Sequence, residues 1–409
     1  MMDVDTQPTS IANIDLSYHR LFTIVYFPRI AFSMVLARTA GQLWQVALIL
    51  FVLQRFHSPV LAGLATFIAI VPGLLISPIV GALLDRYARL RLIQVDYGIA
   101  ALSLVGIATL SLLHMLTPTL LLIIIGISSL TGPMSASGTR TLFPIIVPRE
   151  LWDRANAVDS ASMALATVIG PALAGILLAL LGGEGVFIIT AVVFAIAGAV
   201  LRKVQEPVSE YDTHAPLFRA AGQAVRYVVT HATLRGIILT LWVANVPFGI
   251  LTVAIPYLAI HDLHWNAGNI GTLWSVAGIA SIVAGVSVGR FNSEGRERRI
   301  LFLGLAISAS GAICFVFQTP IALFVGMILF GLAAGPIDIG LFALRQRKTD
   351  PRWLGRVMTV SMSLNFIGNP IGSAIAGPIL EWSITATLLL AAGIAVSGCF
   401  MPYLAIPRE

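Results

Sequence analysis

Charged residues and cysteines are scarce in this chain. Only 11% of the 409 residues are Asp, Glu, Lys or Arg, against roughly 25% in ordinary soluble domains. The two cysteines, Cys314 and Cys399, both lie inside apolar runs, which argues against a disulfide framework. No Asn-x-Ser/Thr sequon occurs, which argues against a glycosylated surface protein. These absences make a soluble or secreted domain unlikely to be the correct class.

Recognisable catalytic and cofactor motifs are also missing. The sequence has no phosphate-binding loop, no metal-cluster spacing and no nucleophile motif. His261, Asp262 and His264 lie close together and have metal-binding chemistry, but such a group in an external loop is more typical of solvated polar residues. We therefore expect no enzyme activity, no ATP-driven pump, no cofactor and no metal.

Long apolar runs dominate what is present, since hydrophobic residues make up 57% of the chain. A membrane-spanning helix needs roughly 20 predominantly apolar residues. The sequence therefore predicts an all-α membrane protein with twelve transmembrane helices, preceded by a polar N-terminal stretch that does not resemble a cleaved signal peptide. The predicted spans cover residues 30–54, 59–83, 91–113, 118–142, 156–181, 185–202, 236–259, 267–289, 299–317, 320–344, 357–380 and 383–404.

The basic residues predict how this bundle is oriented. The chain has 25 Lys and Arg residues. All of them except Arg38 and Arg55 lie near the chain ends or in every second loop, and these positions are all on the same side of the predicted membrane. Positive loops are retained in the cytoplasm. We therefore expect a multi-pass protein of the plasma (inner) membrane with both termini cytoplasmic. The net charge of +6 is explained by these loops, so no nucleic-acid partner is expected.

One polar interval separates two similar halves. Residues 1–202 and 236–409 each contain six predicted spans, and residues 203–235 form a cytoplasmic linker. Within the linker, Val225 and Val229 continue a helical apolar stripe, which predicts a helix lying in the membrane interface or packed against the bundle. Several features recur at nearly constant spacing, which indicates a duplicated six-helix unit. The pairs are Gly81 with Gly285, Arg86 with Arg290, Gly132-Pro133 with Gly335-Pro336, and Pro171 with Pro370.

With these features the chain resembles the major facilitator superfamily over its whole length. The segment Gly81–Arg91 is similar to the superfamily's signature loop, although Ala88 and Leu90 depart from it. The segment containing Gly170, Pro171 and Gly175 resembles the motif of its antiporters. Residues 143–150 and 226–235 resemble the branch that includes macrolide efflux and siderophore export proteins. The resemblance implies an efflux antiporter driven by protons, with helices 1, 4, 7 and 10 lining the cavity.

The signature loop has two interpretations. Its arginines can be a topology signal alone. Asp85 adds a hydrogen-bond acceptor for a helix N-terminus or for Arg140. We therefore interpret the loop as a latch that closes the cytoplasmic side in one state. The predicted gate residues are Gly81, Asp85, Arg86, Arg89, Arg140 and Asp159.

Polar side chains inside the predicted helices mark a candidate pathway, because charges in a membrane are costly. Arg38, Gln42 and Gln45 share one face of the first helix, and Asn245 is their counterpart in the seventh. Asn365 and Asn369 form a similar stripe in the eleventh helix. The alternative is that the amides only hydrogen-bond between helices and stabilise packing.

Three acids lie near the cytoplasmic ends of predicted helices. Asp96 and Asp159 each follow an arginine, Arg91 or Arg154, and are interpreted as partners of these basic loops. Asp338 is hypothesised to pair with Arg38 across the two halves when the cytoplasmic side closes, and to carry the coupling proton. Because Arg38 is the deepest charge, neutral or anionic substrates are favoured over cations.

The sequence thus predicts a monomeric secondary active transporter in the lipid bilayer. It would export small amphipathic compounds by proton antiport, with the two halves rocking around a shared site. Two alternatives remain open. One is an importer or lipid flippase of the same fold. The other is a membrane receptor or assembly factor that has lost transport, since fold does not fix function.

Overall fold

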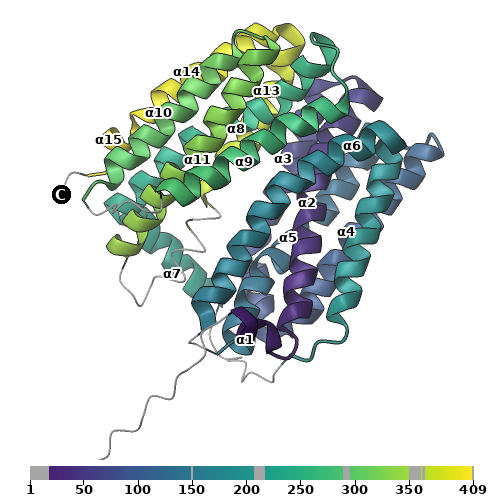
Figure 1. Cartoon of the computed structure of the whole chain (residues 1–409), viewed down its shortest axis with the longest axis vertical. Helices are drawn as coiled ribbons and strands as arrows, with labels where there is room; N and C mark the ends of the chain where they lie inside the picture. The colour runs from purple at the N-terminus through teal and green to yellow at the C-terminus, as the bar shows by residue number, and fades with distance from the viewer. Residues whose placement is uncertain are drawn as a thin grey trace, which may run out of the picture.

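Two bundles of long helices lean against each other and diverge toward one end of the molecule (Figure 1). This is a computed structural model, and it describes residues 18–148, 151–206, 217–288, 295–349, 361 and 364–407. Across those ranges the regular secondary structure is helical throughout. The predicted all-α class is confirmed.

The N-terminal bundle holds the first six helical elements, which are purple to teal in Figure 1. The longest, α6, runs for 50 residues and turns at Gly182, where a φ of 70° interrupts the helix. A glycine adopts this left-handed conformation without steric cost. The elements are α1 (Tyr18–Thr23), α2 (Phe27–Phe56), α3 (Pro59–Arg86), α4 (Arg89–Leu112), α5 (Pro118–Ile146) and α6 (Trp152–Leu201).

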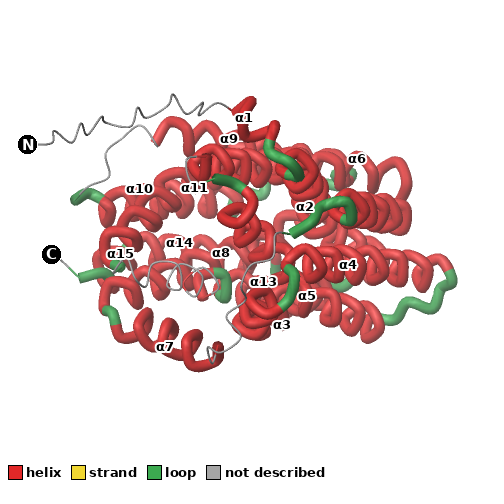
Figure 2. Tube along the Cα trace, turned by 90° about the horizontal axis from the view of Figure 1, so that it is seen from below, coloured by secondary structure: helices red, strands yellow, loops and turns green. Residues whose placement is uncertain are grey.

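The C-terminal bundle follows the amphipathic helix α7, which lies at the edge of the molecule in Figure 2. A helix in the 203–235 linker was predicted, whereas the short α1 was not. The remaining elements are α7 (Leu217–Thr230), α8 (Ala232–His261), α9 (Ala267–Val288), α10 (Glu297–Phe315), α11 (Pro320–Lys348), α13 (Gly368–Trp382), α14 (Ile384–Cys399) and α15 (Met401–Ala405).

Local sequence explains where several helices begin. Pro59 and Pro320 occupy the first turns of α3 and α11, where a missing backbone N–H costs nothing. Ser58 and Thr319 precede them, and their side-chain oxygens accept hydrogen bonds from backbone N–H groups in the first turn. Ser383 caps α14 in the same way.

Helix length and surface chemistry suit a bilayer. Nine of the described helices are long and apolar enough to cross a membrane. Among these, α6 has the length for two passes. The helices α13 and α14 are not among the nine, since they have only 15 and 16 residues within the described ranges. The count of twelve spans therefore remains a prediction. Large apolar side chains such as Leu75, Leu102 and Leu180 are well exposed, as expected of a surface that faces lipid.

The two bundles share a core at one end only. One buried apolar cluster combines residues of both bundles, for example Leu50 of α2 with Ile255 of α8. A second cluster, around Phe27, lies within the N-terminal bundle near α1. A third, around Ile237, lies within the C-terminal bundle near α7. The bundles are therefore packed together at the end remote from α1 and α7, and each keeps its own core at the other end.

Glycines make the joined end tight. The main contacts between the bundles are α3 with α13 and α6 with α9. Gly175 of α6 packs on Ala267 and Gly271 of α9, and Gly63 of α3 packs on the backbone of Ser373 in α13. Backbones approach this closely only where one partner lacks a side chain.

Candidate transport pathway

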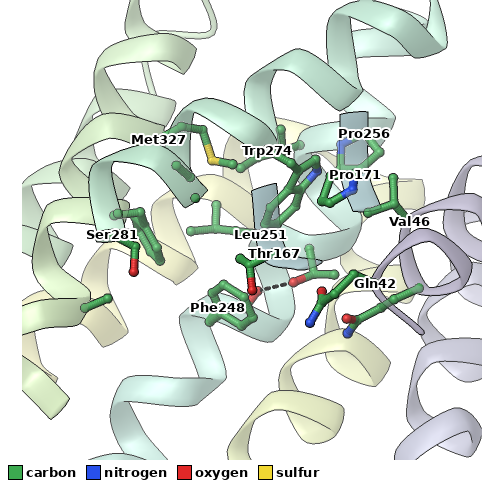
Figure 3. Close-up of a pocket in the computed structure, with 18 of the residues that line it drawn as sticks. Gln42, Val46, Thr167, Pro171, Phe248, Leu251, Pro256, Trp274, Ser281 and Met327 are labelled. Carbon is green, nitrogen blue, oxygen red and sulfur yellow. Dashed lines mark hydrogen bonds between the residues drawn. The ribbon is translucent and has the colours of Figure 1, made fainter. Parts of the chain in front are cut away.

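A cavity of about 210 Å³ lies between the bundles (Figure 3). From the N-terminal bundle, α2 contributes Gln42 and Gln45, and α6 contributes Thr167 and Pro171. The opposite wall comes from α8, α9, α10 and α11. Transporters built from two repeats bind their cargo between the halves.

Aromatic rings cover the wall formed by the C-terminal bundle. Phe248 of α8 stacks on Phe330 of α11 with ring centroids 6.3 Å apart, and its edge contacts Trp274 of α9 at the same centroid separation. Opposite these rings, the side chains of Gln42 and Thr167 supply polar groups. None of the described residues that line this cavity is charged. The cavity therefore suits a molecule with an apolar body and a few hydrogen-bonding groups.

Arg38 faces a different space and is held within its own half. Its guanidinium forms an ion pair with Asp159 of α6, with Nη2 and Oδ1 2.5 Å apart. It also donates to the Asp159 carbonyl and to the Ser162 hydroxyl. Both charged side chains are largely buried, at 15% and 13% exposure. The sequence assigned Asp159 to the basic loop beside Arg154. That interpretation missed Arg38 because the pairing depends on how α2 packs on α6.

Asp338 lies on α11 with its side chain exposed and is absent from the central cavity wall. In this structure the ion-pair partner of Arg38 is therefore Asp159 and not Asp338. The two bundles have separate cores at the end where Arg38 and Asp338 lie. The hypothesis that these residues pair when that end closes remains a prediction.

The predicted asparagines meet between α8 and the start of α13. The Asn245 side chain donates to the Asn365 carbonyl at 3.0 Å, and Trp242 Nε1 donates to the Leu364 carbonyl at 2.5 Å. Asn365 and Asn369 are buried, and none of the three asparagines lines the central cavity. Side chains of α8 thus satisfy carbonyls at a turn that precedes α13.

A second cavity, of about 580 Å³, lies inside the N-terminal bundle. It is lined by Arg38, by Asp96 and by a series of serines from α3, α4 and α5. The carboxyl group of Asp96 is buried, and Ser135 and Thr131 of α5 lie next to it. The sequence interpreted Asp96 as a partner of Arg91, which is exposed. That interpretation is corrected here, and the serines facing Asp96 from α5 were the signal that it overlooked.

Family membership follows from comparison with known proteins. A family model described as Major Facilitator Superfamily matches residues 30–293 and 237–409. The chain belongs to the major facilitator superfamily. It is 36% identical over 404 residues to an uncharacterised MFS-type transporter, y4rN, of Sinorhizobium fredii, covering 96% of this chain and 98% of that protein.

More distant superfamily relatives are exporters by name. The chain is 26% identical to the multidrug efflux pump Tap of Mycolicibacterium fortuitum, covering 86% of this chain and 88% of that protein. It is also 26% identical to the enterobactin exporter EntS of Salmonella typhimurium, covering 87% and 80%. Among solved structures, the nucleoside transporter NupG aligns with a TM-score of 0.74 at 15% identity over 93% of this chain and 99% of that chain. This last likeness shows the fold alone.

The segment that resembles the superfamily's antiporter-type motif sits at two helix contacts. Gly170 packs on Gln42 of α2 within the N-terminal half, and a Cβ there would lie 2.5 Å from the Gln42 Cβ. Pro171 lines the central cavity. Gly175 contacts α9 across the interface of the halves. This segment therefore connects the wall of the central cavity to the end where the two bundles are packed together.

The superfamily's signature loop is only partly described. Gly81 and Arg89 lie at the ends of α3 and α4, and a Cβ at Gly81 would meet no neighbouring atom within 4 Å. Arg89 pairs with Glu206 after α6, at 3.4 Å. The side chains of Asp85, Arg86 and Arg140 lie outside the described part of the structure, so the latch remains a prediction.

Proposed function

We propose that this superfamily member exports small amphipathic compounds. The central cavity supports this proposal, because aromatic rings line one of its walls and uncharged polar groups line the other. The names of Tap and EntS add support, since both relatives are exporters. The cargo would be captured from the end where α1 and α7 lie and released after the halves rock.

We propose further that protons drive this export. Arg38 is held by Asp159 while the two halves are apart at the α1 end. When that end closes, Asp338 on the opposite half would compete with Asp159 for the guanidinium. A proton on Asp338 would remove this competition, so proton binding and closure would be linked. Arg38, Gln42, Gln45, Asn245, Asp338, Asn365 and Asn369 are the proposed pathway and its support.

The membrane placement belongs to the same proposal. Both termini would face the cytoplasm, because the Arg-rich loops lie at that end. The helix α7 would lie in the inner interface, with Val225 and Val229, both exposed, turned toward lipid and Arg226 toward headgroups. The monomer would be the working unit, since each chain contains both halves of the cavity.

Inverted membrane vesicles with an imposed proton gradient test this function. A pH-sensitive dye would report proton movement as amphipathic compounds are added, for the wild type and for Asp338→Asn. We expect substrate-dependent proton release from the wild type and its loss in the variant. Release in both would retain antiport and refute the role of Asp338.

A matched control separates coupling from general damage. Asp262→Asn makes the same carboxylate-to-amide change at an exposed position beyond the end of α8, and should release protons like the wild type. Vectorial assays with radiolabelled compound would give the direction. Accumulation inside right-side-out vesicles, at the expense of the gradient, would refute export and favour import.

A further inference from the structure

The cavity inside the N-terminal bundle is larger than the cavity between the bundles, about 580 Å³ against about 210 Å³. It is an open cleft and not an enclosed void, since Phe366 of the C-terminal bundle also lines it. Its volume falls within the range of small-molecule sites, about 300–1,000 Å³.

The walls of this N-half cavity are rich in hydrogen-bond acceptors. The hydroxyls of Ser129, Ser135 and Thr139 on α5 donate to carbonyls of their own helix. Their oxygen lone pairs remain available to accept from a ligand. Further serines line the opposite walls, Ser77 on α3 and Ser103 on α4. Such a surface favours a ligand that donates hydrogen bonds.

The charges of the N-half cavity are unbalanced. Among the described residues that line it, Arg38 and Asp96 are charged. Arg38 is already neutralised by Asp159. Asp96 is only 6% exposed, and its neighbours Ser135 and Thr131 on α5 are uncharged. Among the ion pairs of the described residues, none includes Asp96. An ionised Asp96 would have no counter-charge in this cavity, so a cation is the ligand that would neutralise it.

The N-half cavity reaches the boundary between the halves. Phe366, which precedes α13 in the C-terminal bundle, forms part of its wall and is 57% exposed. A molecule between the halves can therefore approach this cavity past Phe366.

We infer that the N-half cavity is a binding compartment for the protonated amine of an organic cation, with Asp96 as its counter-charge. An ammonium group carries three donors and no acceptor, which matches one carboxylate surrounded by hydroxyl oxygens. This inference rests on the proposed export function and narrows its substrates to amphipathic amines. The aromatic central cavity would hold the apolar part of molecules large enough to reach both spaces.

Isothermal titration of the purified full-length protein in detergent tests the compartment. The probes are benzylammonium and its uncharged analogue benzyl alcohol, which differ in the group that would meet Asp96. We expect the wild type to bind the amine at least about tenfold more tightly, since hydrogen bonds to charged groups are the stronger kind. Asp96→Asn should reduce this preference to about twofold or less, whereas Asp262→Asn should keep it.

A second variant keeps the test decisive if Asp96→Asn fails to fold. Ser128→Leu fills the cavity from the α5 wall without touching a charge, and should weaken both probes. Equal binding of amine and alcohol by the wild type would overturn the inference and leave an aqueous void only. So would an undiminished amine preference in Asp96→Asn, or unchanged affinity for both probes in Ser128→Leu. Because titration requires no gradient, these results are independent of proton release, and failure of the amine site would leave the export proposal intact.

Discussion

The glycine contacts at the joined end predict that one added methyl group changes which end of the protein is open. Gly271 of α9 faces α6, and a Cβ there would lie 2.6 Å from the Pro171 carbonyl oxygen and 3.1 Å from the Gly175 Cα. These atoms are backbone and have no rotamer with which to avoid the clash. In Gly271→Ala the helices must separate by about 0.8 Å, the difference between 2.6 Å and the 3.4 Å at which ordinary contact begins.

The energetic consequence can be placed on a scale. Overpacking of a tight contact costs about 1–3 kcal/mol. The cost applies only to the conformation in which α6 and α9 touch, so it acts as a differential free energy between the two conformations. A difference of about 1–3 kcal/mol shifts their ratio by roughly 5- to 150-fold. Gly271→Ala should therefore populate the conformation that is open at the joined end and closed at the α1 end.

Distances between spin labels measure this shift directly. One label would replace Tyr87, which is exposed after α3, and the other Arg299, exposed near the start of α10. The native Cys314 and Cys399 would be changed to serine. We expect the distance distribution to move to shorter values in Gly271→Ala. In Gly393→Ala, where a Cβ meets no atom within 4 Å, it should stay unchanged.

One result would refute this reasoning. If Gly271→Ala gives a monodisperse, folded protein with the wild-type distance distribution, the α6–α9 contact does not set the balance between conformations.

Other changes have smaller but defined consequences. Asp159→Ala leaves Arg38 without its carboxylate partner. Breaking such a pair costs about 3–5 kcal/mol of folding free energy, so the midpoint of thermal unfolding should fall. An unchanged midpoint would show that the pair is solvated. Trp274→Ala should weaken binding of an aromatic amphipathic compound about tenfold, since a buried aromatic side chain contributes about 1.5–3 kcal/mol, with equilibrium titration as the measurement. Asn245→Ala removes the donor to the Asn365 carbonyl. It should lower the free energy of unfolding by about 1–3 kcal/mol, measured by thermal unfolding. Equal stability would mean that water replaces the amide.

Helix positions were predictable because single residues determine them. Pro59, Pro118 and Pro320 begin α3, α5 and α11 within a residue of the predicted starts. The break between the fifth and sixth predicted spans was placed at 182–184, where Gly182 turns the chain. In each case the signal is local, a proline at a first turn or a glycine where φ is positive.

Side-chain partners were predictable only along one helix. The spacing of Gln42 and Gln45 placed both on one face of α2, and both line the central cavity. The same spacing grouped Arg38 with them, yet Arg38 points to the N-half cavity and binds Asp159. Which neighbour covers a given face depends on the packing of helices far apart in sequence, and periodicity carries no information about it.

The turn at Gly182 also bears on how the chain enters the membrane during synthesis. Gly183 packs on the ring of Phe51, and the Ser111 hydroxyl donates to the carboxylate of Glu184 at 2.5 Å. The two arms of α6 are thus joined by a few residues that contact α2 and α4, without a free loop between them. We therefore expect the two arms to insert together, as a helical hairpin that docks onto helices already in place.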